Sequence, residues 1–167
     1  MALGLPNWLT LARIALIPIF VLVFFLPLEA ARNGAAAVFI LAALTDWLDG
    51  YLARKWQQCS NLGAFLDPVA DKLIVVAALL LLLADQPTLW MLVPVLIIVA
   101  REIVISALRE WMAAIGERDR VAVSQSGKLK TTVQMLAIVF LLLDLSCCQI
   151  LLAQIGLGLL YFAALLT

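Results

Sequence analysis

Six runs without a charged residue divide the chain, and short polar stretches separate them. The runs are residues 14–28, 33–45, 73–84, 86–100, 131–143 and 145–167. Only the last run reaches the roughly 20 residues that an α-helix needs to cross a hydrocarbon core of about 30 Å. The other five reach that length only if each helix continues into its charged flank. We therefore predict an all-α, polytopic membrane protein with six transmembrane helices, near residues 7–28, 34–54, 66–84, 87–111, 124–143 and 148–166.

The connections between these helices are short, so residues 1–167 are predicted to form a single integral-membrane domain. Charged residues flank the starts of the first, third and fifth helices and the ends of the second and fourth. Because successive spans run in opposite directions, all these ends lie on one face of the membrane. That face carries ten of the eleven Lys and Arg residues, with Arg32 as the exception. The positive-inside rule makes it the cytoplasmic face.

The composition supports a membrane protein and excludes several classes of function. Hydrophobic residues make up 66% of the chain, whereas a soluble domain is roughly half apolar. The net charge is zero, so no basic field favours nucleic acid as a partner. Histidine is absent, which excludes a His-based triad, and two of the three cysteines are adjacent, which disfavours a disulfide framework or a zinc site. No basic region precedes the first apolar stretch, so a removable signal peptide is not expected.

Acidic and small residues share one stripe at the end of the second predicted helix. Given about 3.6 residues per turn, an arc of about 140° contains Asp46, Asp49, Gly50, Ala53 and Arg54. The opposite face of the helix is bulky and apolar. Small residues let another backbone or a ligand approach closely. Short aspartate side chains cannot reach back to water as Lys and Arg do, so carboxylates at this depth need cations.

A second acidic stripe begins the third predicted helix. Gly63, Asp67 and Asp71 are spaced four apart and therefore share one helix face. Pro68 leaves two alternatives: it kinks a helix that begins near Gly63, or Asp67 caps a helix with Pro68 at its first position. The loop 55–62 is short, so the second and third helices are expected to pair antiparallel with their acids facing each other.

Four carboxylates close together in a low dielectric repel one another strongly unless cations neutralise them. Carboxylate oxygens suit hard divalent cations, so the sequence predicts a site for two Mg²⁺ or Mn²⁺ ions. Its ligands would be Asp46, Asp49, Asp67 and Asp71. Two such ions can clamp a phosphoryl group while one acid takes a proton. The alternative is a set of interhelical ion pairs, in which only Arg54 and Lys72 lie close in sequence to the four acids.

These residues match a known motif at every defining position. The pattern Asp46-x-x-Asp49-Gly50-x-x-Ala53-Arg54, then eight residues, then Gly63-x-x-x-Asp67-x-x-x-Asp71, resembles the signature of the CDP-alcohol phosphotransferase family. The resemblance implies a homodimer with six transmembrane helices and a site open to the cytoplasm, in the bacterial inner (cytoplasmic) membrane. Members of this family displace CMP from a CDP-linked donor by attack of an alcohol on the diphosphate.

The resemblance also implies roles for single residues at the matching positions. Asp46, Asp49 and Asp67 would ligate the metals, and Asp71 would bridge them or serve as the general base. The expected CDP site comprises Asp46, Gly50, Ala53, Arg54 and Gly63. The chain is therefore expected to be a metal-dependent CDP-alcohol phosphatidyltransferase.

Longer segments resemble the phosphatidylglycerophosphate synthase branch of that family, which transfers the phosphatidyl group of CDP-diacylglycerol to glycerol 3-phosphate. These segments are residues 6–13, 67–72, 100–110 and 124–135. An anionic acceptor needs cations. Four candidates lie in the charged flanks of the fourth and fifth predicted helices, namely Arg101, Arg109, Lys128 and Lys130. Alternatively, nearby acids neutralise these cations in plain ion pairs, and those acids are Glu102, Glu110 and Glu117.

Two further alternatives concern the first helix and the class of function. Asn7, Thr10 and Arg13 could form one polar face that reaches the same cavity, or Asn7 and Thr10 merely cap and start the helix. Serine, inositol phosphate or a second phosphatidylglycerol would be other acceptors within the family. A small cation transporter would also bury acids, but near the bilayer midplane and often in repeated, broken helices. Here the acids crowd one face, and no repeat is visible.

Overall fold

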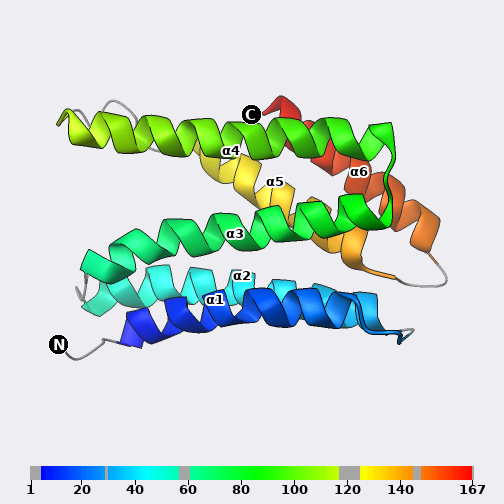
Figure 1. Ribbon diagram of the computed structural model, residues 1–167, viewed down its shortest axis with the longest axis horizontal. Helices are drawn as coiled ribbons and strands as arrows, with labels where there is room; N and C mark the ends of the chain where they lie inside the picture. The colour runs from blue at the N-terminus through cyan, green and yellow to red at the C-terminus, as the bar shows by residue number, and fades with distance from the viewer. Residues whose placement is uncertain (1–4, 29, 57–60, 117–124, 145–147, 167) are drawn as a thin grey trace. The chain divides into compact units, whose positions relative to one another are not determined.

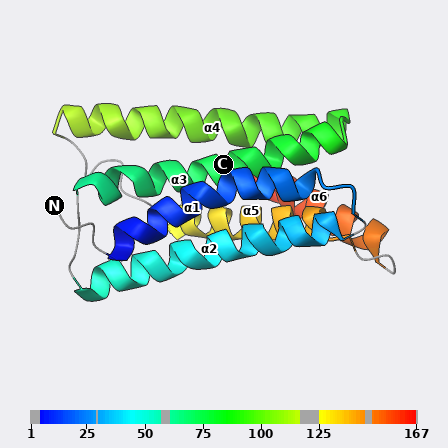
Figure 2. The ribbon, with the colours of Figure 1, turned by 60° about the horizontal axis from the view of Figure 1, so that its bottom comes forward.

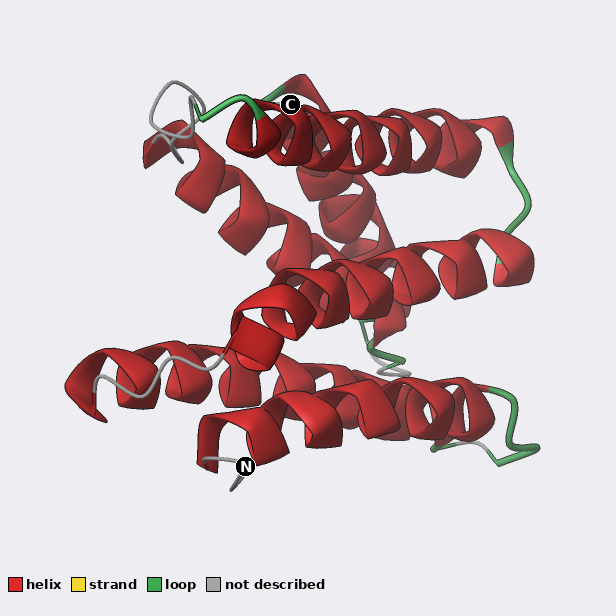
Figure 3. Ribbon diagram, turned by 60° about the vertical axis from the view of Figure 1, so that its left-hand side comes forward, coloured by secondary structure: helices red, strands yellow, loops and turns green. Residues whose placement is uncertain are grey.

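The computed structural model consists of helices joined by short connections (Figure 1). It describes the backbone of residues 5–28, 30–56, 61–116, 125–144 and 148–166. It describes the side chains of residues 11–28, 30–45, 69–70, 72–116, 129–144 and 148–166. The helices are α1 (Leu5–Phe24), α2 (Ala31–Trp56), α3 (Asn61–Asp85), α4 (Leu89–Ala114), α5 (Gln125–Leu142) and α6 (Gln149–Leu165). No strand occurs within the described backbone (Figure 3), so the prediction of an all-α fold is confirmed there.

Most helix ends differ from the predicted bounds by one to three residues, and the end of α1 and the start of α3 differ by more. The predicted first helix ran to residue 28, but α1 ends at Phe24 because Pro27 disfavours the helical conformation of the residue before it. The predicted third helix began at residue 66, but α3 begins at Asn61 and continues past Pro68. Asp67 therefore does not cap this helix. Since proline has no N–H, α3 lacks one backbone hydrogen bond within its first half.

Both ends of α4 carry recognisable capping signals. Thr88 precedes the helix in an extended conformation, and its Oγ1 accepts a hydrogen bond from the backbone N–H of Met91 at 3.3 Å. After the helix, Gly116 adopts a φ of 81° and donates its N–H to the carbonyl of Ala113 at 3.3 Å. A left-handed residue of this kind is a common helix terminator because glycine has no Cβ to clash. Local sequence chemistry thus sets both ends of this long helix.

The helices divide into two compact units. The first unit comprises Met1–Leu81 and Leu142–Asp144, and the second comprises Leu82–Leu141 and Leu145–Thr167. The first unit therefore contains α1, α2 and most of α3. The second contains α4, nearly all of α5, and α6.

In the first unit, α1 packs along α2 through aromatic and small side chains. The buried ring of Phe20 on α1 lies 6.1 Å from that of Phe39 on α2, measured between centroids. Ala35 and Ala36 on α2 are also buried. At Gly34, a Cβ atom would stand 3.1 Å from Cγ1 of Val23 on α1. Small residues on α2 thus allow the two helices to approach closely.

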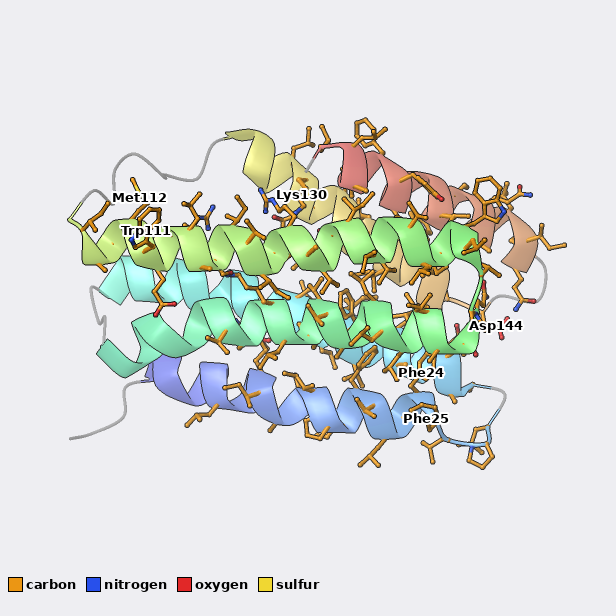
Figure 4. All side chains as sticks on the ribbon, turned by 45° about the horizontal axis from the view of Figure 1, so that its top comes forward. Phe24, Phe25, Trp111, Met112, Lys130 and Asp144 are labelled. Atoms are coloured by element: carbon orange, nitrogen blue, oxygen red, sulfur yellow. The ribbon has the colours of Figure 1, made fainter. Side chains whose placement is uncertain are left out.

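The first unit brings three helix ends together. The start of α1, the end of α2 and the start of α3 lie at one end of this unit in both Figure 1 and Figure 2. This antiparallel order follows from the short connections between consecutive helices. Phe24, Phe25 and Asp144 lie at the opposite end (Figure 4). The helix segments that carry the predicted charged flanks therefore lie at the same end of the first unit.

In the second unit, α6 packs closely against α5 and also contacts α4. A Cβ atom at Gly156 on α6 would stand 2.8 Å from Cγ of Leu141 and 3.2 Å from the carbonyl oxygen of Ala137, both on α5. Leu160 and Ala163 continue the buried face of α6. The buried residues of α4 include Met91, Pro94, Val95 and Ile98.

The structure tests the length and hydropathy of the predicted membrane spans. Among the described residues, α4 is the helix that is long and apolar enough to cross a membrane. Shorter apolar helical stretches are Leu11–Phe24, Ala31–Thr45, Leu129–Leu142 and Gln149–Leu165. Length and hydropathy therefore support one membrane span, α4, among the described residues.

Candidate active site

The four predicted metal ligands lie on two helices of the first unit. Asp46 and Asp49 are in the second half of α2, and Asp67 and Asp71 are in the first half of α3. Their side chains lie outside the described part of the structure. The helical backbone nevertheless supports the predicted spacing, because residues three or four apart on a helix share a face. The two acid-bearing helix segments also lie at the same end of the first unit (Figure 2).

The donor chemistry at this end of the unit fits hard divalent cations. Four carboxylates offer oxygen ligands only, which is the type that Mg²⁺ and Mn²⁺ prefer. Among the described side chains, no group of three or more His, Cys, Asp or Glu residues could hold a metal ion. The four predicted ligands are not among the described side chains, so these aspartates stay the candidates for the metal site.

The predicted CDP-binding positions occupy the same two helices. Gly50, Ala53 and Arg54 follow the acids of α2, and Gly63 precedes those of α3. Their side-chain surroundings also lie outside the described residues. Near the acids, Ala70 is fully buried, and Thr45 donates its hydroxyl to the carbonyl of Ala42 at 2.8 Å.

The polar residues at the start of the first helix occupy successive turns of α1. This helix begins at Leu5, so Asn7 and Thr10 are inside it rather than at its cap. Their side chains lie outside the described residues. Arg13 is described and is only 1% exposed. Arg13 therefore belongs to the interior of the first unit rather than to its surface, and arginine is almost never buried without a polar or charged partner.

The predicted acceptor-binding cations are all in the second unit. Arg101 and Arg109 lie on α4, while Lys128 and Lys130 begin α5. Arg109 is exposed, and the side chain of Lys128 lies outside the described residues. Lys130 is only 1% exposed, and its side chain reaches from α5 toward α4 (Figure 4).

Glu102 joins two of these cations. Lys130 donates from Nζ to Oε1 of Glu102 at 2.7 Å, and Arg101 donates from one terminal nitrogen to the same oxygen at 3.2 Å. The backbone carbonyl of Glu102 also accepts the hydroxyl of Ser106 at 2.7 Å. The alternative in which glutamates pair with these cations is therefore observed for Glu102. Glu117 and its surroundings lie outside the described residues.

Sequence analysis missed a buried amide next to this cluster. Gln134 is 4% exposed and lies four residues after Lys130, so both share one face of α5. A polar residue one turn away from a lysine, inside an otherwise apolar stretch, is the signal that could have identified it.

Comparison with known proteins identifies the family. The family model described as CDP-alcohol phosphatidyltransferase matches residues 3–167. A protein of Sodalis glossinidius is 53% identical over 167 residues, covering 100% of this chain and 90% of the relative. One of Haemophilus influenzae is 56% identical over 138 residues, covering 83% and 75%. One of Escherichia coli K12 is 53% identical over 142 residues, covering 85% and 78%.

All three relatives are named CDP-diacylglycerol–glycerol-3-phosphate 3-phosphatidyltransferase. The family match spans both acidic segments and both cationic segments. It confirms the resemblance that the Asp46-to-Asp71 motif indicated. The chain therefore belongs to the CDP-alcohol phosphatidyltransferase family.

Proposed function

We propose that the protein transfers the phosphatidyl group of CDP-diacylglycerol to sn-glycerol 3-phosphate, forming phosphatidylglycerophosphate and CMP in phospholipid biosynthesis. The observation that carries this proposal is the match to the Sodalis glossinidius relative, which bears the name of that activity and aligns with every residue of this chain. Family membership supports the CDP-linked donor, and the cations of the second unit suit a phosphorylated acceptor.

The proposed reaction is a substitution at phosphorus. The 1-hydroxyl oxygen of glycerol 3-phosphate forms a bond to the phosphorus that bears the lipid, and the bond from this phosphorus to the bridging oxygen of CMP breaks. Asp71 accepts the proton of the hydroxyl group. The positive charge of Arg54 offsets the charge of the departing CMP. Positioning and electrostatic stabilisation supply most of the rate enhancement in reactions of this kind.

The proposed metal site uses the four acids of α2 and α3. Asp46, Asp49, Asp67 and Asp71 would hold two Mg²⁺ or Mn²⁺ ions. When bound, such ions neutralise the carboxylates and stabilise the negative charge on the diphosphate. The oxygen-only donor set supports this assignment. The small residues Gly50, Ala53 and Gly63 would leave room beside it for the CDP moiety.

The proposed acceptor site uses the cations of α4 and α5. Arg101, Arg109, Lys128 and Lys130 would bind the phosphate of glycerol 3-phosphate. Arginine suits this role because its guanidinium group can donate two parallel hydrogen bonds to a phosphate. Lys130 uses one of its three N–H donors in its bond to Glu102, so it keeps donors for an anion.

We also propose that the protein spans the bacterial inner membrane six times as a homodimer, with its site facing the cytoplasm. The exposed surface of α4 supports a lipid environment. Trp90 and Trp111 are 72% and 64% exposed, and 21 residues of helix separate them by about 31 Å. This distance is close to the thickness of a hydrocarbon core. Tryptophan is enriched at both membrane interfaces.

A panel of acceptors tests the proposed function. Purified protein in detergent is incubated with CDP-diacylglycerol, Mg²⁺ and one acceptor: glycerol 3-phosphate, serine, inositol phosphate or phosphatidylglycerol. We expect release of CMP and formation of phosphatidylglycerophosphate only with glycerol 3-phosphate. Release of CMP with serine alone would overturn the choice of acceptor while leaving the family chemistry intact.

A further inference from the structure

We propose that Glu102 is a positioning residue of the acceptor site, which holds Lys130 and Arg101 where they can bind the phosphate of the acceptor. This inference rests on the proposed function and adds a residue that contacts neither substrate. Glu102 acts through a single carboxylate oxygen, Oε1, which accepts hydrogen bonds from both cations.

The hydrogen bond to Glu102 holds the side chain of Lys130 in one conformation. A lysine side chain has four rotatable bonds, and holding it in one conformation has an entropic cost. The 2.7 Å contact between Nζ of Lys130 and Oε1 of Glu102 is a short, charge-assisted hydrogen bond. It joins α5 to α4 across 28 residues of sequence. Lys130 uses one of its three N–H donors in this bond, so two donors stay available to an anion.

The same oxygen orients Arg101 in a weaker contact. A terminal nitrogen of Arg101 lies 3.2 Å from Oε1, and the side chains of Arg101 and Glu102 are 27% and 20% exposed. The buried Nε of Arg101 has no hydrogen-bond partner among the described residues. This guanidinium group therefore has spare donors, as a phosphate ligand requires. Lys130 and Arg101 therefore both keep hydrogen-bond donors that their bonds to Glu102 do not use.

The partial burial of Glu102 explains why it needs these cations. Its side chain is 20% exposed, and a buried carboxylate is costly unless a cation pairs with it. Two cations bond to one oxygen of this acid, whereas a plain structural ion pair would use one cation.

Substitutions of Glu102 separate positioning from two other roles. Glu102→Ala removes the shared oxygen, and we expect it to raise KM for glycerol 3-phosphate about tenfold, with KM for CDP-diacylglycerol within about twofold of wild type. Glu102→Gln keeps an oxygen acceptor, and its KM should stay within about threefold of wild type. Glu110→Ala is the matched control, because Glu110 is an exposed acid on the same helix. It should leave both KM values unchanged.

A double-substitution cycle tests whether Glu102 acts through Lys130. In a Lys130→Met background, Glu102→Ala should raise KM for glycerol 3-phosphate by about twofold or less, because its main partner is gone. A full tenfold increase in that background would overturn the inference. If Glu102→Ala does not fold, Glu102→Asp retracts the carboxylate by one methylene group and should show the same selective rise in KM.

The remaining outcomes are also decisive. An unchanged KM in Glu102→Ala overturns the inference, as does an equal rise in KM for both substrates, which is the sign of a merely structural role. A KM for Glu102→Gln below that of wild type would show that Glu102 only reduces the positive charge, and would also overturn it. In each case, wild-type activity with glycerol 3-phosphate leaves the proposed function intact. If the wild-type protein does not use glycerol 3-phosphate, the proposed function and the inference both fail.

Discussion

Asn33 and Asp144 are joined by two hydrogen bonds although 111 residues separate them. Nδ2 of Asn33 donates to the carbonyl oxygen of Asp144 at 2.9 Å, and the backbone N–H of Asp144 donates to Oδ1 of Asn33 at 2.9 Å. Asn33 lies in the first turn of α2, and Asp144 lies two residues after the end of α5. The side-chain amide thus satisfies both backbone groups of Asp144 and fixes this segment to the first unit.

Replacement of Asn33 should lower stability without affecting catalysis. Asn33→Ala leaves a partly buried N–H and carbonyl without these partners, which costs about 1–3 kcal/mol. Asn33→Asp keeps an acceptor for the N–H of Asp144 but loses the donor, so it should also be destabilised. The measurement is thermal unfolding in detergent, with Gln86→Ala as an exposed amide control. An unchanged melting temperature in Asn33→Ala would show that the two bonds contribute nothing net.

The two glycines of α6 provide a second, internally matched test. A Cβ atom at Gly156 would stand 2.8 Å from Leu141 and 3.2 Å from the backbone oxygen of Ala137. The backbone oxygen cannot easily move, so Gly156→Ala should destabilise the protein by about 1–3 kcal/mol. At Gly158 a Cβ atom would meet nothing within 4 Å, so Gly158→Ala should be neutral or stabilise the helix by up to about 1 kcal/mol.

Thermal unfolding of both variants provides the measurement. Because the two substitutions add the same methyl group to the same helix, helix propensity cancels from the comparison. The difference in melting temperature then reports the contact of α6 with α5. Equal melting temperatures would mean that α6 does not approach α5 as closely as the distances indicate.

Local features of the sequence were sufficient to predict much of the fold. The uncharged runs predicted all six described helices, because an apolar stretch between polar flanks is a strong local signal. The boundary of α3 was missed because a helix that continues past Pro68 must offset a lost hydrogen bond by tertiary packing, which local sequence does not reveal. The division into two units was not predicted either, since it depends on contacts between distant helices.

For the candidate site, too, the sequence was sufficient to predict one part and insufficient for another. The placement of Asp46 and Asp49 on one helix could be predicted from the apolar run before them, and the period of a helix then predicts a shared face. The contact between Glu102 and Lys130 could not be assigned, because several acids and cations were available and only the tertiary structure selects this pair. The two hydrogen bonds between Asn33 and Asp144 could not be predicted, since each residue by itself is an ordinary polar residue near a helix end.

Substitution of Asp71 tests its proposed role as the proton acceptor. Asp71→Asn retains the size of the side chain but removes its basicity, so CMP release should fall by at least about a hundredfold. The melting temperature should stay close to that of wild type. Asp85→Asn is the control, because Asp85 is an exposed acid at the end of α3 that has no proposed role. Near-normal turnover in Asp71→Asn would remove the role assigned to Asp71.

Removal of divalent cations tests the metal site independently of any single acid. Treatment with EDTA should abolish CMP release, and added Mg²⁺ or Mn²⁺ should restore it, because four carboxylates need cations to offset their mutual repulsion. Asp49→Asn removes one negative ligand, so the Mg²⁺ concentration for half-maximal activity should rise by about tenfold or more. Glu110→Ala serves as the control for loss of an acid elsewhere. Full activity in EDTA would exclude metal ions from the reaction, and the acids of α2 and α3 would then have to be neutralised by cations of the protein itself, such as Arg54 and Lys72.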